Sequence, residues 1–282
     1  MSFTPPEIEL FLLGLATAGY VLAWGLYLRA LWTNQERFSQ QASMVTGIAF
    51  IFQAGSFALR TYRAGHLPIY NAYEFSAIFA GGIVLTHLIF ERLSRQRTLG
   101  VATLPVAVAL LFYAWTLSKG IEPILPIFKS FWLKINVLTA FVAYSSLAAT
   151  FGASCLYLIT MNSKNSEPAV NDASRGTILD RVAYQAAMVG FSFLTIMIIS
   201  GAIWAEYVWG RFWSWDPKET WSLITWLIVA AYLHTRYHRR WIGRKAAVLG
   251  VVGFLFVLMT FLGVDFLSPR QHDFLLWRRA GQ

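Results

Sequence analysis

Eight apolar segments separated by polar connections are the feature that most restricts the fold of this 282-residue chain. Each is long enough to cross the roughly 30 Å hydrocarbon layer of a membrane as a helix. Because unpaired backbone groups are costly in lipid, we predict an all-α, polytopic membrane helical bundle with about eight transmembrane helices, forming one membrane domain over residues 1–282. The predicted spans are 8–32, 43–62, 72–90, 99–117, 132–161, 183–204, 219–237 and 246–267.

Composition supports this fold class. Charged residues make up 13% of the chain and hydrophobic residues 57%, whereas an ordinary soluble domain has about 25% charged residues. The net charge of +9 would suggest nucleic-acid binding in a soluble protein. Here the basic residues lie between apolar segments, so we expect a lipid bilayer and no nucleic acid as the partner. The single cysteine, Cys155, excludes an internal disulfide and a cysteine-rich metal site.

Basic residues gather in three linkers, 92–97, 164–181 and 236–245, which eight spans would place on one side of the membrane. The positive-inside rule assigns that side to the cytoplasm. A tryptophan-rich loop, the loops 65–74 and 119–131 and both termini then face outward. We also predict that residues 162–180 form a flexible connection and that Pro105 kinks the fourth span or delays its start.

The segment WAEYVWGRFWSWDPKETWSLITW, residues 204–226, contains six tryptophans and a helix-start signal. Asp216 can accept hydrogen bonds from the backbone N–H groups of Lys218 and Glu219. Pro217 suits the first helical position, and the Glu219 side chain can reach back to complete a capping box. We therefore predict that a helix begins at Asp216 and holds an outward-facing Trp-rich loop at its N-terminal end.

This loop favours a flat ligand with an acidic edge. An interfacial aromatic belt would spread its tryptophans over all helix ends. Here they concentrate beside one helix start, at Trp209, Trp213, Trp215 and Trp221. Their rings can stack on a planar apolar molecule, while Arg211, Lys218 and the positive helix terminus at Asp216 can bind carboxylates. Haem has two propionates and an iron that needs axial ligands; a quinone or lipid would explain the aromatics but not the cations.

Histidines are the candidate iron ligands. His234 follows Asp216 by 18 residues, which is roughly 27 Å along a helix, so it should lie near the cytoplasmic end of its span. It is either an interfacial histidine bonded to a carbonyl or a cofactor ligand. His272 and His66 are predicted to face outward. The simpler explanation for His272 is a solvated tail residue, and for His66 a hydrogen bond that orders its loop. His87 and His238 are predicted to be structural.

Several blocks between residues 60 and 272 resemble one family. The segment WGRFWSWDPKETWSLITW, followed by YLHTR, resembles the WWD domain of the CcsA/ResC family, the haem-handling membrane subunit of system II cytochrome c maturation. GHLPIYNAYE resembles the family's GHxPxxNxYE loop. PILPIFKSFWLKINV and GVDFLSPRQH resemble its PxxPxxxSxWLxxHV and GVNxL…H stretches.

The resemblance implies cytochrome c maturation in a bacterial cytoplasmic (inner) membrane or a thylakoid membrane, with the active site on the outer or lumenal side. The chain would translocate haem b to the outer face and present it for thioether attachment to a CxxCH apocytochrome c. It would act as a component of a haem lyase (holocytochrome c synthase) with a ResB/CcsB-type membrane partner. No nucleophile–base pair is discernible in the chain, so the substrate thiols would supply the chemistry and no catalytic residue is assigned.

The resemblance also assigns ligands. His234 matches the family's intramembrane ligand and His272 matches one of two external histidines that bind the iron. Asn136 occupies the position of the other, and an amide is a poor iron ligand. The haem would then be five-coordinate on His272, or His66 or a partner's side chain would complete the site. Alternatively, the chain is a haem exporter or scaffold without lyase activity. A quinone-binding structural subunit is a third hypothesis.

Overall fold

The computed structural model describes residues 4–121, 123–161 and 170–263. Over these residues the chain forms eight α-helices and no strand. The helices are α1 Pro5–Thr33, α2 Glu36–Ala64, α3 Ala72–Ser94, α4 Gly100–Thr116, α5 Phe131–Met161, α6 Val170–Trp209, α7 Pro217–His238 and α8 Arg244–Leu258. Two short 3₁₀ helices, η1 Arg97–Leu99 and η2 Pro126–Lys129, and a π-helical turn, η3 Met259–Gly263, complete the described elements.

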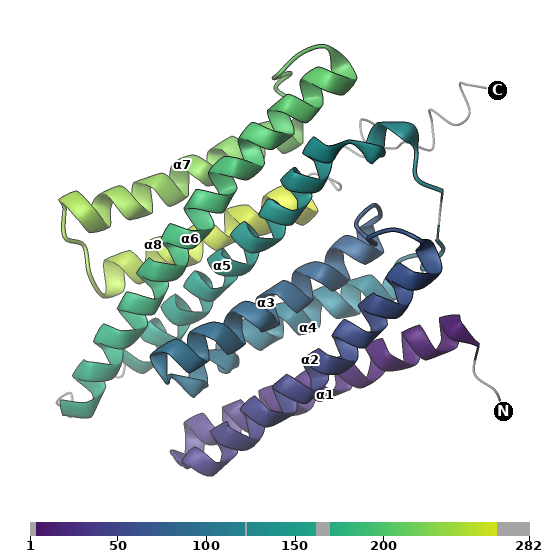
Figure 1. Ribbon diagram of the computed structural model, residues 1–282. Coiled ribbons are helices and arrows are strands. Elements are labelled where there is room, and N and C mark those ends of the chain that lie inside the picture. The colour runs from purple at the N-terminus through teal and green to yellow at the C-terminus, as the bar shows by residue number, and fades with distance from the viewer. Residues whose placement is uncertain (1–3, 122, 162–169, 264–282) are drawn as a thin grey trace.

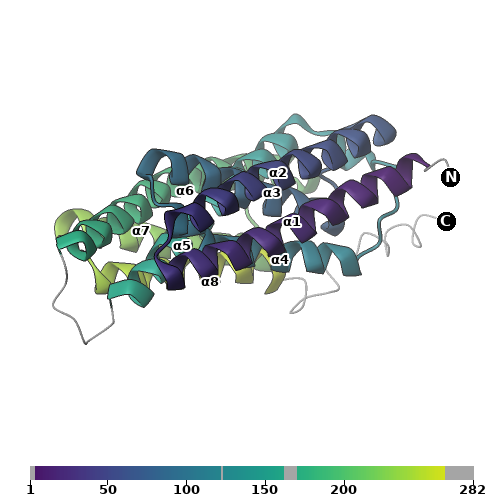
Figure 2. The same cartoon turned by 90° about the horizontal axis from the view of Figure 1, so that it is seen from below.

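The helices run up and down along one common axis (Figure 1). The loops 65–71 and 210–216 and the 3₁₀ helix η2 lie at one end, which we call the loop end. The connections α1–α2, α3–α4 and α7–α8 lie at the other end, together with the end of α5 and the start of α6. Figure 2 shows the same separation along the axis. The three basic linkers therefore share one end, as predicted; which side of the membrane that end faces stays a prediction.

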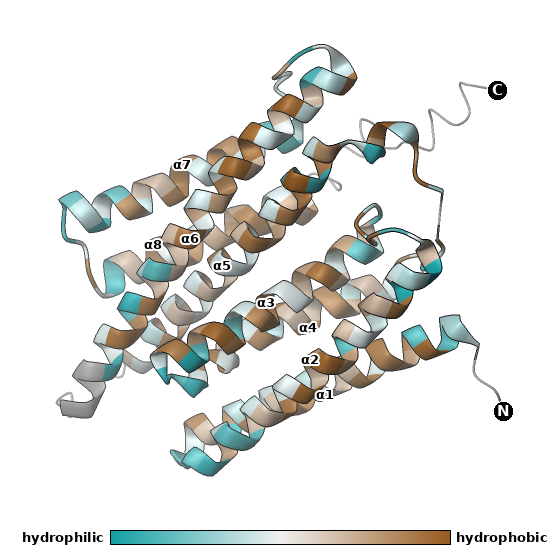
Figure 3. Cartoon of the chain, in the orientation of Figure 1, coloured by the Kyte–Doolittle hydropathy of each residue, from teal (hydrophilic) through white to brown (hydrophobic). Residues whose placement is uncertain are grey.

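The predicted polytopic bundle is confirmed. Seven of the eight helices are long and apolar enough to cross a membrane, and polar residues gather near the helix ends (Figure 3). The exception is α7, which carries acidic Glu219 in its first turn and Arg236 and His238 in its last turn. These groups place polar side chains at both ends of this 22-residue helix.

Helix α5 is the centre of the bundle. Of its apolar stretch, 67% is buried, against 28% for that of α2. Its buried positions are mostly small, which allows close approach of neighbouring helix backbones in a membrane. These small buried residues are Ala143, Ser145, Ser146, Ala148, Ala149, Thr150, Gly152, Ala153 and Ser154. Helices α3, α4, α6 and α8 all pack against α5, so it fixes the relative position of both halves of the chain.

Pro105 neither delays the start of the fourth span nor ends it, because α4 begins at Gly100 and continues through the proline. A proline inside a helix has no N–H for the carbonyl four residues earlier. That carbonyl belongs to Val101, and the indole Nε1 of Trp24 on α1 donates to it at 3.1 Å. The group that Pro105 leaves without its helical partner thus binds a neighbouring helix instead.

The prediction of a flexible connection over residues 162–180 is wrong for its second part, since α6 already begins at Val170. Asp180 explains the stability of this extension. Its carboxylate accepts hydrogen bonds from the Arg236 guanidinium and, at 3.1 Å, from the backbone N–H of Gly243. The polar start of α6 is therefore held against the α7–α8 turn by a contact between residues far apart in the sequence.

His87 lies in a buried polar cluster between α1, α3 and α4. Its Nε2 lies 3.2 Å from the Tyr27 hydroxyl and 3.1 Å from a Glu91 oxygen, and its Nδ1 lies 3.1 Å from the Thr103 hydroxyl. The Tyr27 hydroxyl also donates to Glu91 at 2.6 Å. Since both ring nitrogens have partners, the structure agrees with a structural role for His87.

Candidate functional site

Only a short part of the tryptophan-rich segment 204–226 is a loop. Helix α6 continues to Trp209, and Gly210 ends it with a left-handed φ of 66° and an N–H bonded to the Glu206 carbonyl at 2.9 Å. Glycine is favoured at this position because it has no Cβ penalty there. Helix α7 starts at Pro217, so the loop proper comprises residues 210–216.

The predicted capping box is confirmed and extends into the loop. The Asp216 carboxylate accepts the Glu219 N–H at 2.9 Å, and the Glu219 carboxylate accepts from the Asp216 N–H at 3.4 Å. Glu219 also accepts the backbone N–H of Ser214 at 2.7 Å and its hydroxyl at 3.2 Å. One carboxylate therefore bonds to the residues on both sides of Trp215.

Trp215 is held in an unusual conformation. Its φ of 59° lies in the left-handed region, where a bulky residue is strained. Its side chain is 68% exposed and meets Trp213 edge to face, with ring centroids 5.7 Å apart. The Trp213 Nε1 is buried and has no hydrogen-bond partner among the described residues. The loop thus presents one exposed indole, beside a second indole whose buried N–H has no partner among the described residues.

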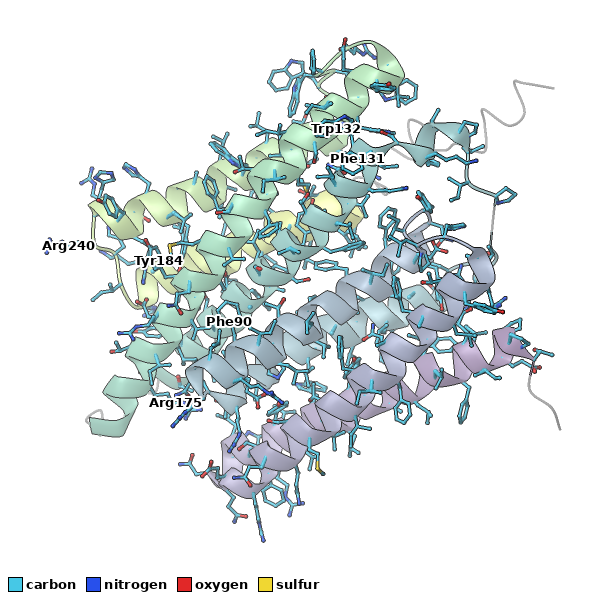
Figure 4. All side chains as sticks on the ribbon, in the orientation of Figure 1. Phe90, Phe131, Trp132, Arg175, Tyr184 and Arg240 are labelled. Atoms are coloured by element: carbon cyan, nitrogen blue, oxygen red, sulfur yellow. The ribbon has the colours of Figure 1, made fainter. Side chains whose placement is uncertain are left out.

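The six tryptophans divide into two groups. Three are explained by packing: Trp204 Nε1 donates to the Ile127 carbonyl at 3.3 Å, Trp226 Nε1 donates to Thr195 at 2.9 Å, and the Trp221 ring lies 5.9 Å from Phe256 on α8. The other three, Trp209, Trp213 and Trp215, form what we call the indole shelf. Figure 4 shows that Phe131 and Trp132, at the start of α5, lie at the same end of the bundle as this loop.

The chemistry of the indole shelf fits a planar, partly anionic ligand. Trp209 is 46% exposed and Trp215 is 68% exposed, so both offer ring area for stacking. The unsatisfied Trp213 N–H can donate to an acceptor, and the exposed Arg211 is available for a carboxylate. Lys218 lies in the first turn of α7, and Asp216 is the N-cap of this helix at the end of the loop. That these residues bind a cofactor stays a prediction. They include the aromatic rings and the cationic donors that a planar ligand with carboxylates requires.

Asn136 is committed to helix packing. Its side-chain Nδ2 donates to the Met197 carbonyl on α6 at 2.7 Å. Gly201, one turn further along α6, makes room for the amide, since a Cβ at that position would lie 2.7 Å from Nδ2. Asn136, at the expected position of an external histidine, therefore links α5 to α6. Nothing in its contacts indicates an iron ligand.

His234 lies on α7 near the end opposite the indole shelf, as its distance from Asp216 in the sequence predicts. Its side chain is exposed at the surface of the bundle, and its ring centroid lies 4.5 Å from that of His238 one turn later. No cluster of three metal-ligating side chains occurs among the described residues. His272 is outside the described residues, so its predicted role as a ligand is untested.

A buried charge cluster organises the loop end of the first half of the chain. The Arg60 guanidinium donates to Glu9 at 3.0 Å and to Glu74 at 2.9 Å. It also donates to the carbonyls of Lys119 and Gly120 at 3.1 and 3.0 Å. The three charged side chains are only 4%, 1% and 3% exposed. Sequence analysis missed this cluster, which joins α1, α2, α3 and the segment after α4.

The loop that carries His66 is held by the same cluster. Asn71 caps α3 by accepting the Glu74 N–H at 2.9 Å, and Glu74 accepts the Tyr70 N–H at 2.9 Å. Partial burial and the nearby Glu74 carboxylate raise the pKa of Tyr70. The Asn71–Glu74 spacing was the sequence signal for this cap. His66 itself is half-buried, and its Nδ1 lies 2.9 Å from the Leu67 carbonyl.

Comparisons with known proteins show the family of the chain. Residues 69–272 match the family described as cytochrome C assembly protein. The chain is 36% identical to the cytochrome c biogenesis protein CcsA of Synechococcus elongatus over 275 residues, covering 80% of this chain and 85% of that protein. The chain is 31% identical to CcsA of Gloeobacter violaceus over an alignment of 325 residues, which covers 95% of this chain and 96% of that protein.

One solved structure has a similar fold. The cytochrome c heme lyase CcmF superposes with a TM-score of 0.61 at 18% sequence identity. The match covers 94% of this chain but 51% of the CcmF chain, so this chain spans about half the length of that protein. At this identity the likeness shows a shared bundle architecture.

Proposed function

Because this chain belongs to the cytochrome c assembly protein family, we propose that it carries haem b to the outer face of the membrane and presents it for attachment to an apocytochrome c. It is an integral membrane protein of cytochrome c biogenesis. The loop end then faces outward, and the basic linkers face the cytoplasm in accordance with the positive-inside rule.

The observation that carries the proposal is the indole shelf itself. Its loop is held by the Asp216–Glu219 capping box, so its exposed rings keep their place without a ligand. Trp209 and Trp215 would stack on the macrocycle, and the unsatisfied Trp213 N–H would meet an acceptor at its edge. Arg211 and Lys218 would bind the propionates. A preorganised surface of this kind positions a substrate at little entropic cost.

The attachment reaction needs positioning more than it needs a catalytic group. Each cysteine thiol of the CxxCH segment adds across a haem vinyl group; an S–C bond forms, and the thiol hydrogen goes to the other vinyl carbon. In this proposal the chain holds the porphyrin plane and its propionates, His272 binds the iron, and the vinyl edge faces the incoming peptide. His234 would hold haem within the membrane on its way outward.

A ResB/CcsB-type partner would bind the apocytochrome and complete the lyase. Co-expression of both proteins with a CxxCH reporter tests this, with covalent haem on the reporter as the readout. We expect attachment to fall strongly in Trp213→Phe, which removes the unsatisfied donor, and to persist in Trp204→Phe, whose indole serves packing. Equal activity of the two variants would contradict the proposal. Maturation by the purified chain alone would disprove the need for the partner.

A second function is favoured by one contact. The bond from Asn136 to the Met197 carbonyl commits the amide to α6, which supports a haem exporter or scaffold without lyase activity. Covalent haem on the reporter with Asn136 unchanged would reject this alternative. Haem in the membrane-extracted protein without any attachment would support it.

A further inference from the structure

A hollow opens at the loop end of the bundle. It has a volume of about 470 Å³, within the usual range for small-molecule sites, about 300–1,000 Å³. Residues from the end of α2 and the loop after it line the hollow on one side, and Ile121 with residues from Pro123 to Lys129 line it on the other. Its lining residues are Ala64, His66, Ile121, Pro123, Ile124 and Lys129. We call this hollow the His66 groove.

The hydrogen bond of His66 indicates which ring nitrogen donates. The Leu67 oxygen, 2.9 Å from Nδ1, is a carbonyl and can only accept. Nδ1 must therefore carry the hydrogen, and in the neutral ring the lone pair is on Nε2. A backbone carbonyl that orients one nitrogen while the other stays basic is the usual arrangement of a histidine that binds a metal. His87, by contrast, has partners on both nitrogens.

The other lining groups select the kind of ligand. Ala64, Ile121, Pro123 and Ile124 offer apolar surface, and Lys129 adds one exposed cation. A single histidine does not hold a bare metal ion, but it is sufficient for the iron of a porphyrin, whose other equatorial ligands come with the ligand. We propose that the His66 groove binds an iron porphyrin through His66 Nε2, with Lys129 paired to a propionate. This proposal rests on the proposed haem-handling function.

Both walls of the groove are anchored to Arg60. Its guanidinium holds the carbonyls of Lys119 and Gly120, directly before Ile121. Through Glu74 it also fixes Tyr70, because the same carboxylate accepts the Tyr70 N–H. The groove therefore keeps its shape as part of the folded bundle.

Aromatic contacts connect the groove to the tryptophan-rich segment. The His66 and Tyr70 ring centroids are 5.3 Å apart, and those of Tyr70 and Phe128 are 6.3 Å apart. Ile127, adjacent to Phe128, accepts the bond from Trp204. Since the side chains of Tyr70 and Phe128 lie between His66 and the contact with Trp204, we treat the groove as a haem site separate from the indole shelf.

Haem titration of the purified full-length chain tests the proposal. The probes are iron(III) protoporphyrin IX and metal-free protoporphyrin IX. We expect the wild type to bind one more equivalent of the iron porphyrin than His66→Ala, with loss of the imidazole-ligated spectrum in the variant. Added imidazole should restore that spectrum in His66→Gly. Lys129→Gln should weaken this site about tenfold, whereas the exposed control Lys134→Gln should leave it unchanged.

Three results would overturn the groove as an iron-porphyrin site. In the first, His66→Ala and the wild type bind the same number of equivalents and give the same spectrum. In the second, the wild type binds no iron porphyrin. In the third, His66→Ala loses as much binding of the metal-free porphyrin as of the iron porphyrin. The proposed function is judged separately, by covalent haem on the CxxCH reporter. If the Trp213→Phe and Trp204→Phe variants attach haem equally while His66→Ala loses one equivalent, the groove stands and the proposed role of the shelf fails.

Discussion

The Glu219 carboxylate accepts the backbone N–H of Ser214 at 2.7 Å, so a residue inside α7 fixes the backbone of the loop before it. The same carboxylate accepts the Ser214 hydroxyl and the Asp216 N–H. Trp215, between these two residues, has no freedom to leave its left-handed conformation unless these bonds break. The helix start therefore acts as the support of the indole shelf.

Loss of this support should release the loop. Glu219→Ala removes three accepted hydrogen bonds, and we expect it to destabilise the helix start by about 1–2 kcal/mol. Haem affinity should fall as the indoles lose their fixed positions. Near-ultraviolet circular dichroism of the tryptophans and haem titration measure the two effects. Glu219→Gln keeps an amide oxygen as acceptor and should retain part of both; a Glu219→Ala variant with unchanged spectrum and affinity would contradict this account.

Trp215→Gly should change stability and function in opposite directions. Glycine adopts a φ of 59° without strain, so relief of the left-handed backbone should stabilise the fold by about 1 kcal/mol. The same variant loses an exposed stacking surface and should bind haem less tightly. Thermal unfolding and haem titration are the measurements. Trp226→Phe is the matched control, because it should lose stability through the bond to Thr195 and keep haem affinity.

Asn136 should matter for packing. Asn136→Ala removes the bond to the Met197 carbonyl and should cost about 1 kcal/mol of stability, seen as a lower melting temperature in detergent. Asn136→His places a ligand where the family resemblance expects one, but its ring must displace the contact with Gly201. We expect it to fold less stably and to raise covalent haem on the reporter. No change in melting temperature for Asn136→Ala would show that the amide contact is unimportant.

The Arg60 cluster should be the most sensitive polar site of the loop end. Glu74→Gln leaves the buried guanidinium with one carboxylate fewer, and breaking a buried pair costs about 3–5 kcal/mol. We expect poor accumulation in membranes and loss of the His66 groove. Glu36→Gln is the control, because its pair with Arg97 is exposed and should contribute less than about 1 kcal/mol. Similar melting temperatures for the two variants would contradict the burial argument.

The local sequence pattern was sufficient to predict the membrane helical bundle and the helix start at Asp216. Both features depend on short stretches of sequence: apolar runs of helical length, and the spacing of Asp216, Pro217 and Glu219. In lipid, the need to pair backbone hydrogen-bonding groups leaves few alternatives to a helix. The loop length was overestimated, since Trp204 and Trp209 continue α6. The polar start of α6 was taken for a linker because its partner Arg236 follows Asp180 by 56 residues.

Contacts between residues far apart in the sequence decide which side chains of the candidate site are engaged in packing. Residues 204–226 contain six tryptophans that the sequence does not distinguish from one another. Three of them pack inside the bundle, because Ile127, Thr195 and Phe256 lie beside them in the fold. Asn136 reads as a missing ligand until α6 places the Met197 carbonyl 2.7 Å away. Which donors and acceptors are already paired depends on how helices far apart in the chain pack together, and no local pattern encodes that arrangement.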